Sequence, residues 1–202
     1  PGHEIRVMSI GPAGENLVKF ADITNEYYHV QGRCGLGAVM GSKKLKAIAV
    51  RGDAQIPVAQ PREFQQAVRE AIETITQPWH PALKGAHRKF GRLGALPLAK
   101  GALRQGSLPG KNFQTQVLDG WAEKTGLETS LPYLAGPAGN CYRCPLSCFN
   151  MVEVKEGKYA GLRIASGTFV APIFEFGAKC GMVDLPAIWK AKEMCHRLGL
   201  DL

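Results

Sequence analysis

Three cysteines within eight residues constrain this chain more than any other feature of its sequence. They form the pattern Cys141-x2-Cys144-x3-Cys148, in the stretch CYRCPLSC, which follows Pro137 and Gly139 and is therefore predicted to lie on a loop. Three thiolates this close together can bind one face of a cubane iron–sulfur cluster, with a fourth cysteine supplied from a distant part of the chain. The order of the spacings is the reverse of the radical-SAM order. We therefore predict an iron–sulfur cluster at this loop.

Zinc is the main alternative to iron at this loop, and a loop without metal is the third interpretation. A structural zinc site usually joins two close pairs of ligands, and Cys180, Cys195 and His196 are the residues that could complete one. Cys180 and Cys195 lie on apolar segments and are expected to be buried. Cys34 lies beside Arg33 in a glycine-rich stretch, where an exposed and reactive thiol is expected.

The first part of the chain is rich in glycine and is predicted to contain β-strands. We predict a strand at residues 5–10, a turn at 11–16, a short helix at 17–23, a glycine-rich loop with a short apolar helix at 31–42, and a buried strand at 45–50. A linker with Pro57 and Pro61 follows. These features predict a domain boundary near residue 57.

The rest of the chain is mainly helical. We expect a helix from Pro61 to about residue 77, a basic helix at 82–92, irregular structure at 93–120, a β-hairpin at 149–164, and a last helix capped by Asp184. The fold class predicted for the whole chain is α+β, mainly α. Its two parts are residues 1–57 and 58–202.

The composition is that of a folded globular chain, with 45% hydrophobic and 21% charged residues. The net charge is +8, and a stretch between Thr74 and Leu118 contains seven basic and no acidic residues: Lys84, Arg88, Lys89, Arg92, Lys100, Arg104 and Lys111. Such a stretch can bind nucleic acid, an acidic protein or a phosphorylated cofactor, or can be a solvated face.

The cysteine usage favours metal chemistry in a reducing compartment. No apolar run is long enough for a membrane span, and we expect no signal peptide. Since the chain begins without Met and ends in what reads as a turn, we expect a fragment of a larger protein.

Five motifs together resemble the aldehyde ferredoxin oxidoreductase family. In chain order they are GPAGEN at 11–16, GRCGLGAVMGSKKLKAI at 32–48, LPGKNF at 108–113, CYRCPLSC at 141–148 and KCGMVDLPAIWKAKEMCHRLGLD at 179–201. The resemblance implies a tungsten or molybdenum bis-pyranopterin cofactor with a nearby [4Fe-4S] cluster. It also implies that residues 1–57 are the C-terminal part of an N-terminal pterin-binding domain, and that residues 58–202 are an incomplete helical domain with the cluster loop.

The resemblance assigns roles to individual residues. Cys141, Cys144 and Cys148 match three cluster ligands, and the family's fourth cysteine is expected beyond Leu202. Arg33, Cys34 and Gly35 match part of the pterin-binding loop, with Cys34 in place of a commoner glycine. The pterin contacts at the end of the last helix are matched by His196, Leu200 and Asp201, with His196 in place of the usual acidic or amide residue.

One departure concerns acid–base chemistry. Many family members carry a glutamate close to the metal, and Ala171, in GTFVAP at 167–172, falls at that position. An alanine cannot transfer protons, and Glu175, one helical turn further on, is the only nearby carboxylate. The catalytic residue is therefore unassigned.

The function implied is a cytoplasmic oxidoreductase that oxidises aldehydes to carboxylic acids and passes electrons through the cluster to ferredoxin or a similar acceptor. The implied assembly is a homodimer or a complex with a redox subunit, without nucleic acid. A divergent member with another substrate, such as an aryl-CoA reductase, is the alternative. A zinc-stabilised nucleic-acid-binding module and an electron-transfer subunit without its own active site are the rivals from other classes.

Overall fold

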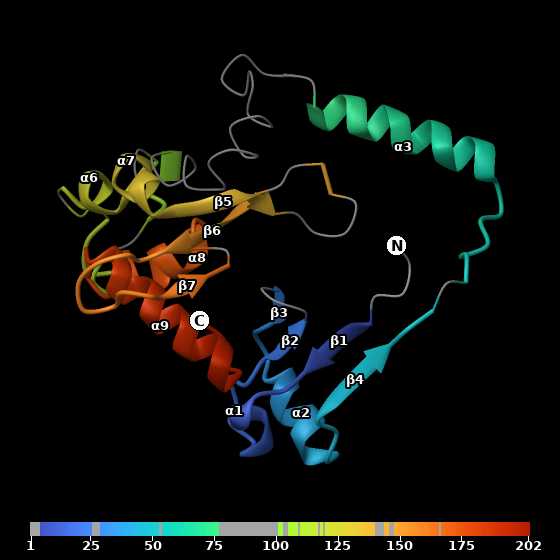
Figure 1. The fold of residues 1–202 in the computed structure, drawn as a ribbon, viewed down its shortest axis with the longest axis horizontal. Helices are drawn as coiled ribbons and strands as arrows, with labels where there is room; N and C mark the ends of the chain where they lie inside the picture. The colour runs from blue at the N-terminus through green and yellow to red at the C-terminus, as the bar shows by residue number, and fades with distance from the viewer. Residues whose placement is uncertain are drawn as a thin grey trace.

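The structure is a computed structural model, and it describes residues 5–25, 29–52, 54–76, 101–102, 105–108, 110–116, 118, 120–139, 144–145, 148–165 and 167–202. Figure 1 shows a small β-containing unit at the N-terminal end and a larger unit that contains the C-terminus, with one long helix standing apart from both. The predicted basic helix at 82–92 and most of the basic stretch lie outside the described residues.

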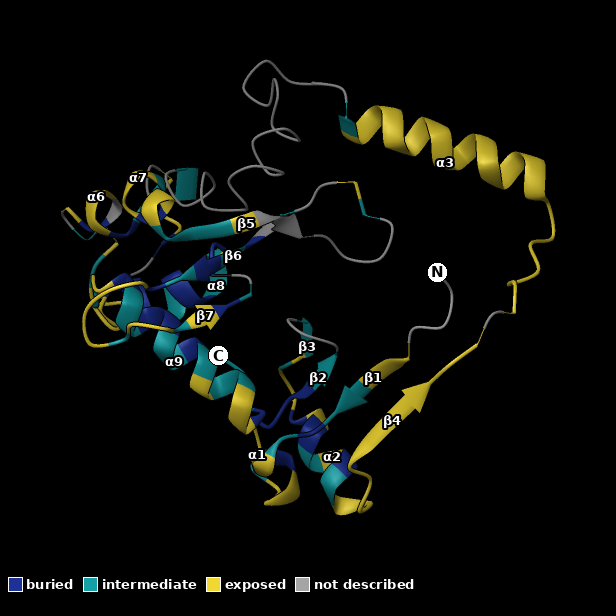
Figure 2. Ribbon diagram, in the orientation of Figure 1, coloured by how far each residue is buried: buried dark blue, intermediate teal, exposed yellow. Residues whose placement is uncertain are grey.

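The N-terminal unit is built on an antiparallel sheet in the order β3-β2-β1-β4. Its strands are β1 (Arg6–Ser9), β2 (Ile23–Asn25), β3 (His29–Gln31) and β4 (Ala47–Val50). The predicted strand at 5–10 is confirmed as β1. β4 falls in the predicted strand at 45–50, but all four of its residues are exposed, so the prediction that this strand is buried is wrong. β4 is the edge strand of the sheet, and no described residue covers its apolar side chains (Figure 2).

Two short helices pack beside this sheet, α1 (Pro12–Glu15) and α2 (Leu36–Ser42), and α2 is the short apolar helix predicted within 31–42. They approach so closely that a Cβ atom on Gly41 would lie 1.9 Å from the carbonyl oxygen of Gly14. The predicted helix at 17–23 is wrong. Leu17 adopts a left-handed conformation with φ 56°, which stops a right-handed helix, and Ala21 forms a β-bridge instead.

The long helix α3 (Pro61–Thr76) confirms the helix predicted after Pro61, which occupies its first position. No residue of α3 is buried. Its apolar stripe is 38–56% exposed and consists of Phe64, Val68, Ile72 and Ile75. The helical spacing was therefore a reliable sign of secondary structure, but nothing in the described part of the chain packs against the stripe (Figure 2).

The larger unit contains a second antiparallel sheet in the order β5-β6-β7, with strands β5 (Leu134–Gly139), β6 (Phe149–Glu153) and β7 (Arg163–Ile164). β6 and β7 confirm the predicted hairpin, with Val152 opposite Ile164. β5 was not predicted, because its sequence LAGPAG carries none of the usual strand-forming residues. The short helices α6 (Trp121–Thr125), α7 (Leu127–Ser130) and η2 (Leu131–Tyr133) lead into it.

The last part of the chain forms α8 (Val170–Pro172), the π-helical segment η3 (Ile173–Ala178) and α9 (Leu185–Leu198). Asp184 caps α9 as predicted, since its Oδ1 accepts a hydrogen bond from the Ala187 N–H at 3.4 Å. The main core lies between these helices and the second sheet. Two fully buried indoles of the described residues donate to carbonyl oxygens, Trp189 to Gly167 at 2.8 Å and Trp121 to Met182 at 3.1 Å.

Main-chain contacts join the two units at the end of α9. Ala21 pairs with Leu200 in an antiparallel bridge. The Asp22 N–H donates to the Gly199 carbonyl at 2.9 Å, and the Asp201 N–H donates to the Phe20 carbonyl at 3.1 Å. The chain thus has a mixed α/β fold in which residues 20–22 and 199–201 form one seam. None of the helices in the described ranges is long and apolar enough to cross a membrane.

Candidate functional site

The glycine-rich loop after β3 presents Arg33 at the seam between the two units. Cys34 and Gly35 both have left-handed conformations, with φ 78° and 70°, and α2 starts directly afterwards. Gly32 allows the loop to approach the end of α9, because a Cβ atom there would lie 2.1 Å from Asp201 Oδ1. The side chain of Arg33 is 79% exposed. The loop therefore holds its backbone against the seam and extends its guanidinium group into the open.

The structure brings Arg33 together with two carboxylates that are distant in the sequence. Its Nε lies 3.7 Å from Asp201 Oδ2, and its Nη2 lies 3.9 Å from Glu175 Oε1. Glu175 also accepts a hydrogen bond from Lys179 Nζ at 2.6 Å. The carboxylate side chains of Glu175 and Asp201 are only 21% and 20% exposed. Residues expected in a pterin site thus lie side by side, and their role in binding stays a prediction.

The left-handed Gly199, with φ 73°, ends α9 and turns the chain so that Leu200 and Asp201 meet the N-terminal unit. His196 lies three residues before this turn and is partly buried. Burial lowers the pKa of His196 from 6.5 to about 4; the charge of Lys192 lowers it further and that of Glu193 opposes the change. The imidazole is therefore neutral at physiological pH, with one nitrogen that donates and one that accepts a hydrogen bond.

Asp22 is a buried acid at the seam that the sequence analysis missed. Its side chain has no exposed surface, and its Oδ2 has no hydrogen-bond partner within the described part of the chain. Burial raises the pKa of Asp22 from 3.8 to about 6, the charge of Asp201 adds to the rise, and a hydrogen bond from Thr24 opposes it. The pKa of Cys195 is also raised, mainly by burial and to a smaller extent by the charges of these two aspartates. The only sequence signal was an acidic residue between apolar neighbours in Phe20–Ile23.

Lys192 is a second buried charge that the sequence analysis missed, although it lies four residues after the buried Ile188 on α9. It is 2% exposed, and its Nζ donates to the Ala165 carbonyl at 3.1 Å. Burial lowers its pKa from 10.5 to about 7. Helical spacing from Ile188 already placed this lysine on the buried face of the helix.

The cysteine loop is described only in part. Cys144 and Cys148 are partly buried, and Cys148 lies directly before β6. Cys141 lies outside the described residues, and the described residues contain no group of three or more His, Cys, Asp or Glu side chains that could hold a metal. The three-cysteine ligand set therefore stays a prediction. Cys34 is exposed as expected, whereas the expected burial of Cys180 is wrong, since it is exposed at the end of the π-helical segment, and Cys195 is only partly buried.

Ala171 lies in α8 and is partly buried, four residues before Glu175. The two side chains therefore lie about one turn apart along the same stretch of helix. Both oxygens of the Glu175 carboxylate face cations, Oε2 facing Lys179 and Oε1 facing Arg33. This arrangement bears on whether Glu175 can replace a metal-proximal acid.

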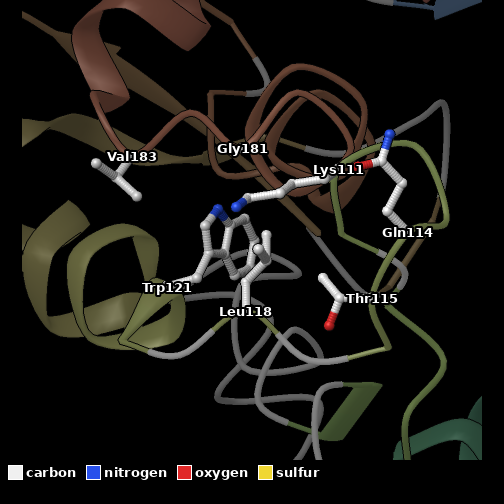
Figure 3. A pocket seen from close by; sticks show the side chains of 7 residues that line it. All are labelled: Lys111, Gln114, Thr115, Leu118, Trp121, Gly181 and Val183. Atoms are coloured by element: carbon white, nitrogen blue, oxygen red, sulfur yellow. The ribbon is translucent and has the colours of Figure 1, made fainter.

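A cavity of about 550 Å³ lies elsewhere in the larger unit. Figure 3 shows its lining residues, with the Lys111 side chain extending in the direction of the Trp121 indole. None of the predicted site residues lines this cavity. It is therefore separate from the seam where Arg33 and Asp201 meet.

Comparison with known proteins identifies the family. A model described as "Aldehyde ferredoxin oxidoreductase, N-terminal domain" matches residues 1–52, and one described as "Aldehyde ferredoxin oxidoreductase, domains 2 & 3" matches residues 66–202. The second match alone covers more than half of the chain. The chain belongs to the aldehyde ferredoxin oxidoreductase family, as its motifs indicated.

Three relatives illustrate the range of this family. The tungsten-containing aldehyde ferredoxin oxidoreductases of Thermococcus kodakarensis and Pyrococcus furiosus are each 38% identical to the chain over 199 residues, which is 98% of this chain and 31% of each relative. The WOR-like subunit of an aliphatic sulfonate oxidoreductase from Pyrococcus furiosus is 27% identical over 209 residues, covering 98% of this chain and 30% of that relative. The chain thus spans about 31% of the length of its more similar relatives.

A solved structure has the same fold. The active-site complex BamBC of benzoyl coenzyme A reductase, in complex with 1,5-dienoyl-CoA, matches with a TM-score of 0.74 at 24% identity, over 98% of this chain and 30% of that chain. At this identity the match establishes the fold alone. It agrees with the mixed α/β architecture described above.

Proposed function

We propose that this chain forms part of the cofactor site of a tungsten-dependent oxidoreductase that oxidises aldehydes to carboxylic acids and passes electrons to ferredoxin. The observation that carries the proposal is the convergence of Arg33 and Asp201, two residues matched to the family's pterin contacts, at one seam of the fold. The cofactor's identity is inferred from the family to which the chain belongs and from the tungsten enzymes among the chain's relatives. A tungsten bis-pyranopterin, when bound, supplies the two-electron redox chemistry.

The residues at the seam fit the chemical groups of a pterin cofactor. The exposed guanidinium of Arg33 suits the cofactor's anionic phosphates, which bind arginine through paired hydrogen bonds. Asp201 has carboxylate oxygens that can accept from pterin N–H groups, and neutral His196 can donate and accept at the same heterocycle. Leu200 has its backbone paired with Ala21, which fixes the position of its neighbour Asp201. We assign Cys34 and Gly35 to the same loop contact.

The thiols of Cys144 and Cys148 suit an iron–sulfur cluster, since thiolates are its usual ligands and both residues are partly buried. With Cys141 they would supply three thiolates, and we place the fourth cysteine in a part of the enzyme beyond Leu202. Membership of the family favours this cluster over the zinc-stabilised nucleic-acid-binding module. The electron acceptor, the cytoplasmic location and assembly as a homodimer or with a redox subunit belong to the same proposal.

The experiment is elemental and cofactor analysis of the natural protein that carries this sequence, purified anaerobically from cells supplied with tungstate. We expect tungsten, pterin, iron and acid-labile sulfide in each chain, and we expect Cys144→Ser to lose iron. Cys180→Ser is the matched control, because this cysteine is exposed and is not one of the three in the loop. Stoichiometric zinc without iron or sulfide would overturn the cluster, and absence of pterin would overturn the cofactor site.

A second substrate class is favoured by Ala171. If alanine occupies the position of the family's metal-proximal glutamate, proton transfer during aldehyde oxidation lacks its usual group. Relatives and neighbours named for an aliphatic sulfonate and for benzoyl-CoA indicate that this fold serves other substrates. The alternative function is therefore a divergent member such as an aryl-CoA reductase, and comparing turnover of aldehydes with that of aromatic CoA thioesters separates the two.

A further inference from the structure

Glu175 lies between two cations that come from different parts of the chain. Its Oε2 accepts from Lys179 Nζ at 2.6 Å, one turn along the same segment, and its Oε1 lies 3.9 Å from Arg33 Nη2. Arg33 in turn faces Asp201 through Nε at 3.7 Å. The guanidinium group is therefore flanked by two carboxylates, one from η3 and one that lies three residues after the end of α9.

The exposures of these three side chains differ in a way that suits a ligand. The two carboxylates are about one-fifth exposed, whereas the Arg33 side chain is 79% exposed. A guanidinium has five N–H donors in a rigid fork. The Nε edge and Nη2 face the carboxylates, so the donors on Nη1 remain for an anion approaching from the open side. The flanking carboxylates thus restrain the orientation of an otherwise solvated cation.

The segment that carries Glu175 is itself held by an unusual turn. Lys111, Asn112 and Phe113 have left-handed conformations with φ of 47°, 53° and 67°. The Lys111 N–H donates to the Ala178 carbonyl at 2.9 Å and the Asn112 N–H to the Lys179 carbonyl at 2.7 Å. Lys179 Nζ also lies 5.7 Å from the centre of the Phe113 ring. This turn, in the motif LPGKNF, therefore supplies hydrogen-bond donors to carbonyls at the end of a π-helical segment. The π-helix is rare in proteins as a whole, but where it occurs it is frequently found at functional sites.

A general acid or base must reach the reacting proton with a free oxygen at about 2.6–3.2 Å. Glu175 directs one oxygen at Lys179 and the other toward Arg33, which is the arrangement of a group that holds another residue in place. We infer that Glu175 is a positioning residue that, together with Asp201, orients Arg33 toward the anionic groups of the cofactor. This inference rests on the proposed function, because it needs an anionic cofactor on the open side of Arg33.

The test measures how fast the natural holoprotein loses its cofactor. Wild type, Glu175→Gln, Arg33→Lys and the double variant are purified anaerobically, and tungsten and pterin per chain are followed during dialysis at low and raised salt. We expect Glu175→Gln to lose the cofactor about 2–5 times faster than wild type, the effect of a partly exposed charge pair. We expect the double variant to lose it no faster than Arg33→Lys alone, since both substitutions act on one interaction.

Two further variants make the result specific. Glu15→Gln is the matched control, because Glu15 forms an exposed ion pair with Lys46 at 3.1 Å and lies outside this cluster; its cofactor loss should equal that of wild type. Lys179→Met leaves Glu175 in place but removes the cation at its Oε2, and it should also accelerate loss. It serves as the second route if Glu175→Gln does not fold. The pH dependence of turnover in the cofactor-loaded fraction of Glu175→Gln should keep the shape of the wild-type profile.

The inference is overturned if Glu175→Gln retains its cofactor like wild type, and above all if it then loses turnover together with one limb of the pH profile, since Glu175 would then transfer a proton. It is also overturned if the Arg33 and Glu175 effects are additive. If wild-type protein itself contains no tungsten or pterin, the proposed function fails and the inference fails with it. That outcome is visible before any variant is compared, so the two failures are distinguishable.

Discussion

Replacing Asp22 by asparagine should change how stability depends on pH. In the folded protein the carboxyl is fully buried with Oδ2 unpartnered within the described residues, and its pKa is about 6 rather than 3.8. Because the folded state binds the proton more tightly than the unfolded state, ionisation of Asp22 weakens folding as pH rises from about 4 to about 6, and the penalty stays constant above that range. Asparagine has the same shape, and its Oδ1 can accept the bond from Thr24, but it carries no charge.

The size of the effect follows from the two pKa values. A difference between 3.8 and about 6 corresponds to a full penalty of about 3 kcal/mol at neutral pH. At about pH 4.5 only about 1 kcal/mol of that penalty has developed. Burying the amide of asparagine without a partner costs about 1–3 kcal/mol, but this cost does not depend on pH. The stability of Asp22→Asn relative to wild type should therefore increase by about 2 kcal/mol between about pH 4.5 and pH 7.5.

The assay is the midpoint of urea unfolding for both proteins across this pH range. His196 has a pKa lowered to about 4, so its contribution to stability is lost as pH falls from 6.5 through 4, opposite in sign to that of Asp22. His196 is present in both proteins, so its effect cancels in the comparison. Glu156→Gln, a neutralised carboxyl at an exposed turn, controls for net charge and should track wild type. A difference between Asp22→Asn and wild type that stays constant with pH would refute the reasoning.

Three other substitutions test separate features. Cys34→Gly should stabilise the protein by about 1 kcal/mol, because residue 34 has φ 78°, and Cys34→Ala should give no such gain; equal midpoints of thermal unfolding for the two would contradict this. Lys192→Met should raise the free energy of unfolding by about 2 kcal/mol or more below about pH 7, with the gain declining toward pH 10.5 as the unfolded lysine deprotonates. Its refutation is a gain that does not vary with pH. If Ala171 occupies the position of the missing acid, wild type should oxidise acetaldehyde ~10²–10⁴ times more slowly than an enzyme with a positioned acid. Ala171→Glu should then shift preference from aromatic toward short-chain aldehydes, and unchanged, fast acetaldehyde turnover in both would exclude this role.

Local patterns predicted the elements whose geometry depends on local sequence. Pro61 with its apolar spacing predicted α3, Asp184 predicted the start of α9, and the pattern of residues 149–164 predicted the β6–β7 hairpin. The helix at 17–23 was wrong because long-range pairing of Ala21 with Leu200 and a left-handed Leu17 override the local preference. The prediction that β4 is buried was wrong because an alternating sequence pattern indicates which face of a strand is apolar but not whether another element covers that face.

The candidate site was predictable only as a set of separate motifs. The sequence indicated Arg33 and Asp201 through a family resemblance, and the fold shows that they lie 3.7 Å apart. Nothing local indicated that Glu175 faces Arg33, since the contact depends on a π-helical segment held by a turn more than 60 residues earlier in the chain. Asp22 escaped notice because burial of a single acid is a property of the tertiary structure. The cluster cysteines were predicted from their spacing alone, and this ligand set stays a prediction because Cys141 lies outside the described residues.

The seam formed by residues 20–22 and 199–201 affects how this site can be altered by mutation. Its contacts are hydrogen bonds between main-chain atoms, which persist when most side chains at the seam are exchanged. The spacing between the Arg33 loop and the end of α9 should therefore tolerate sequence drift. The contact from η3 is different, because side chains alone make it. Directed evolution aimed at new substrates or cofactor affinity should accordingly select substitutions on η3 and in the turn at residues 111–113. The main-chain geometry of the seam should stay unchanged.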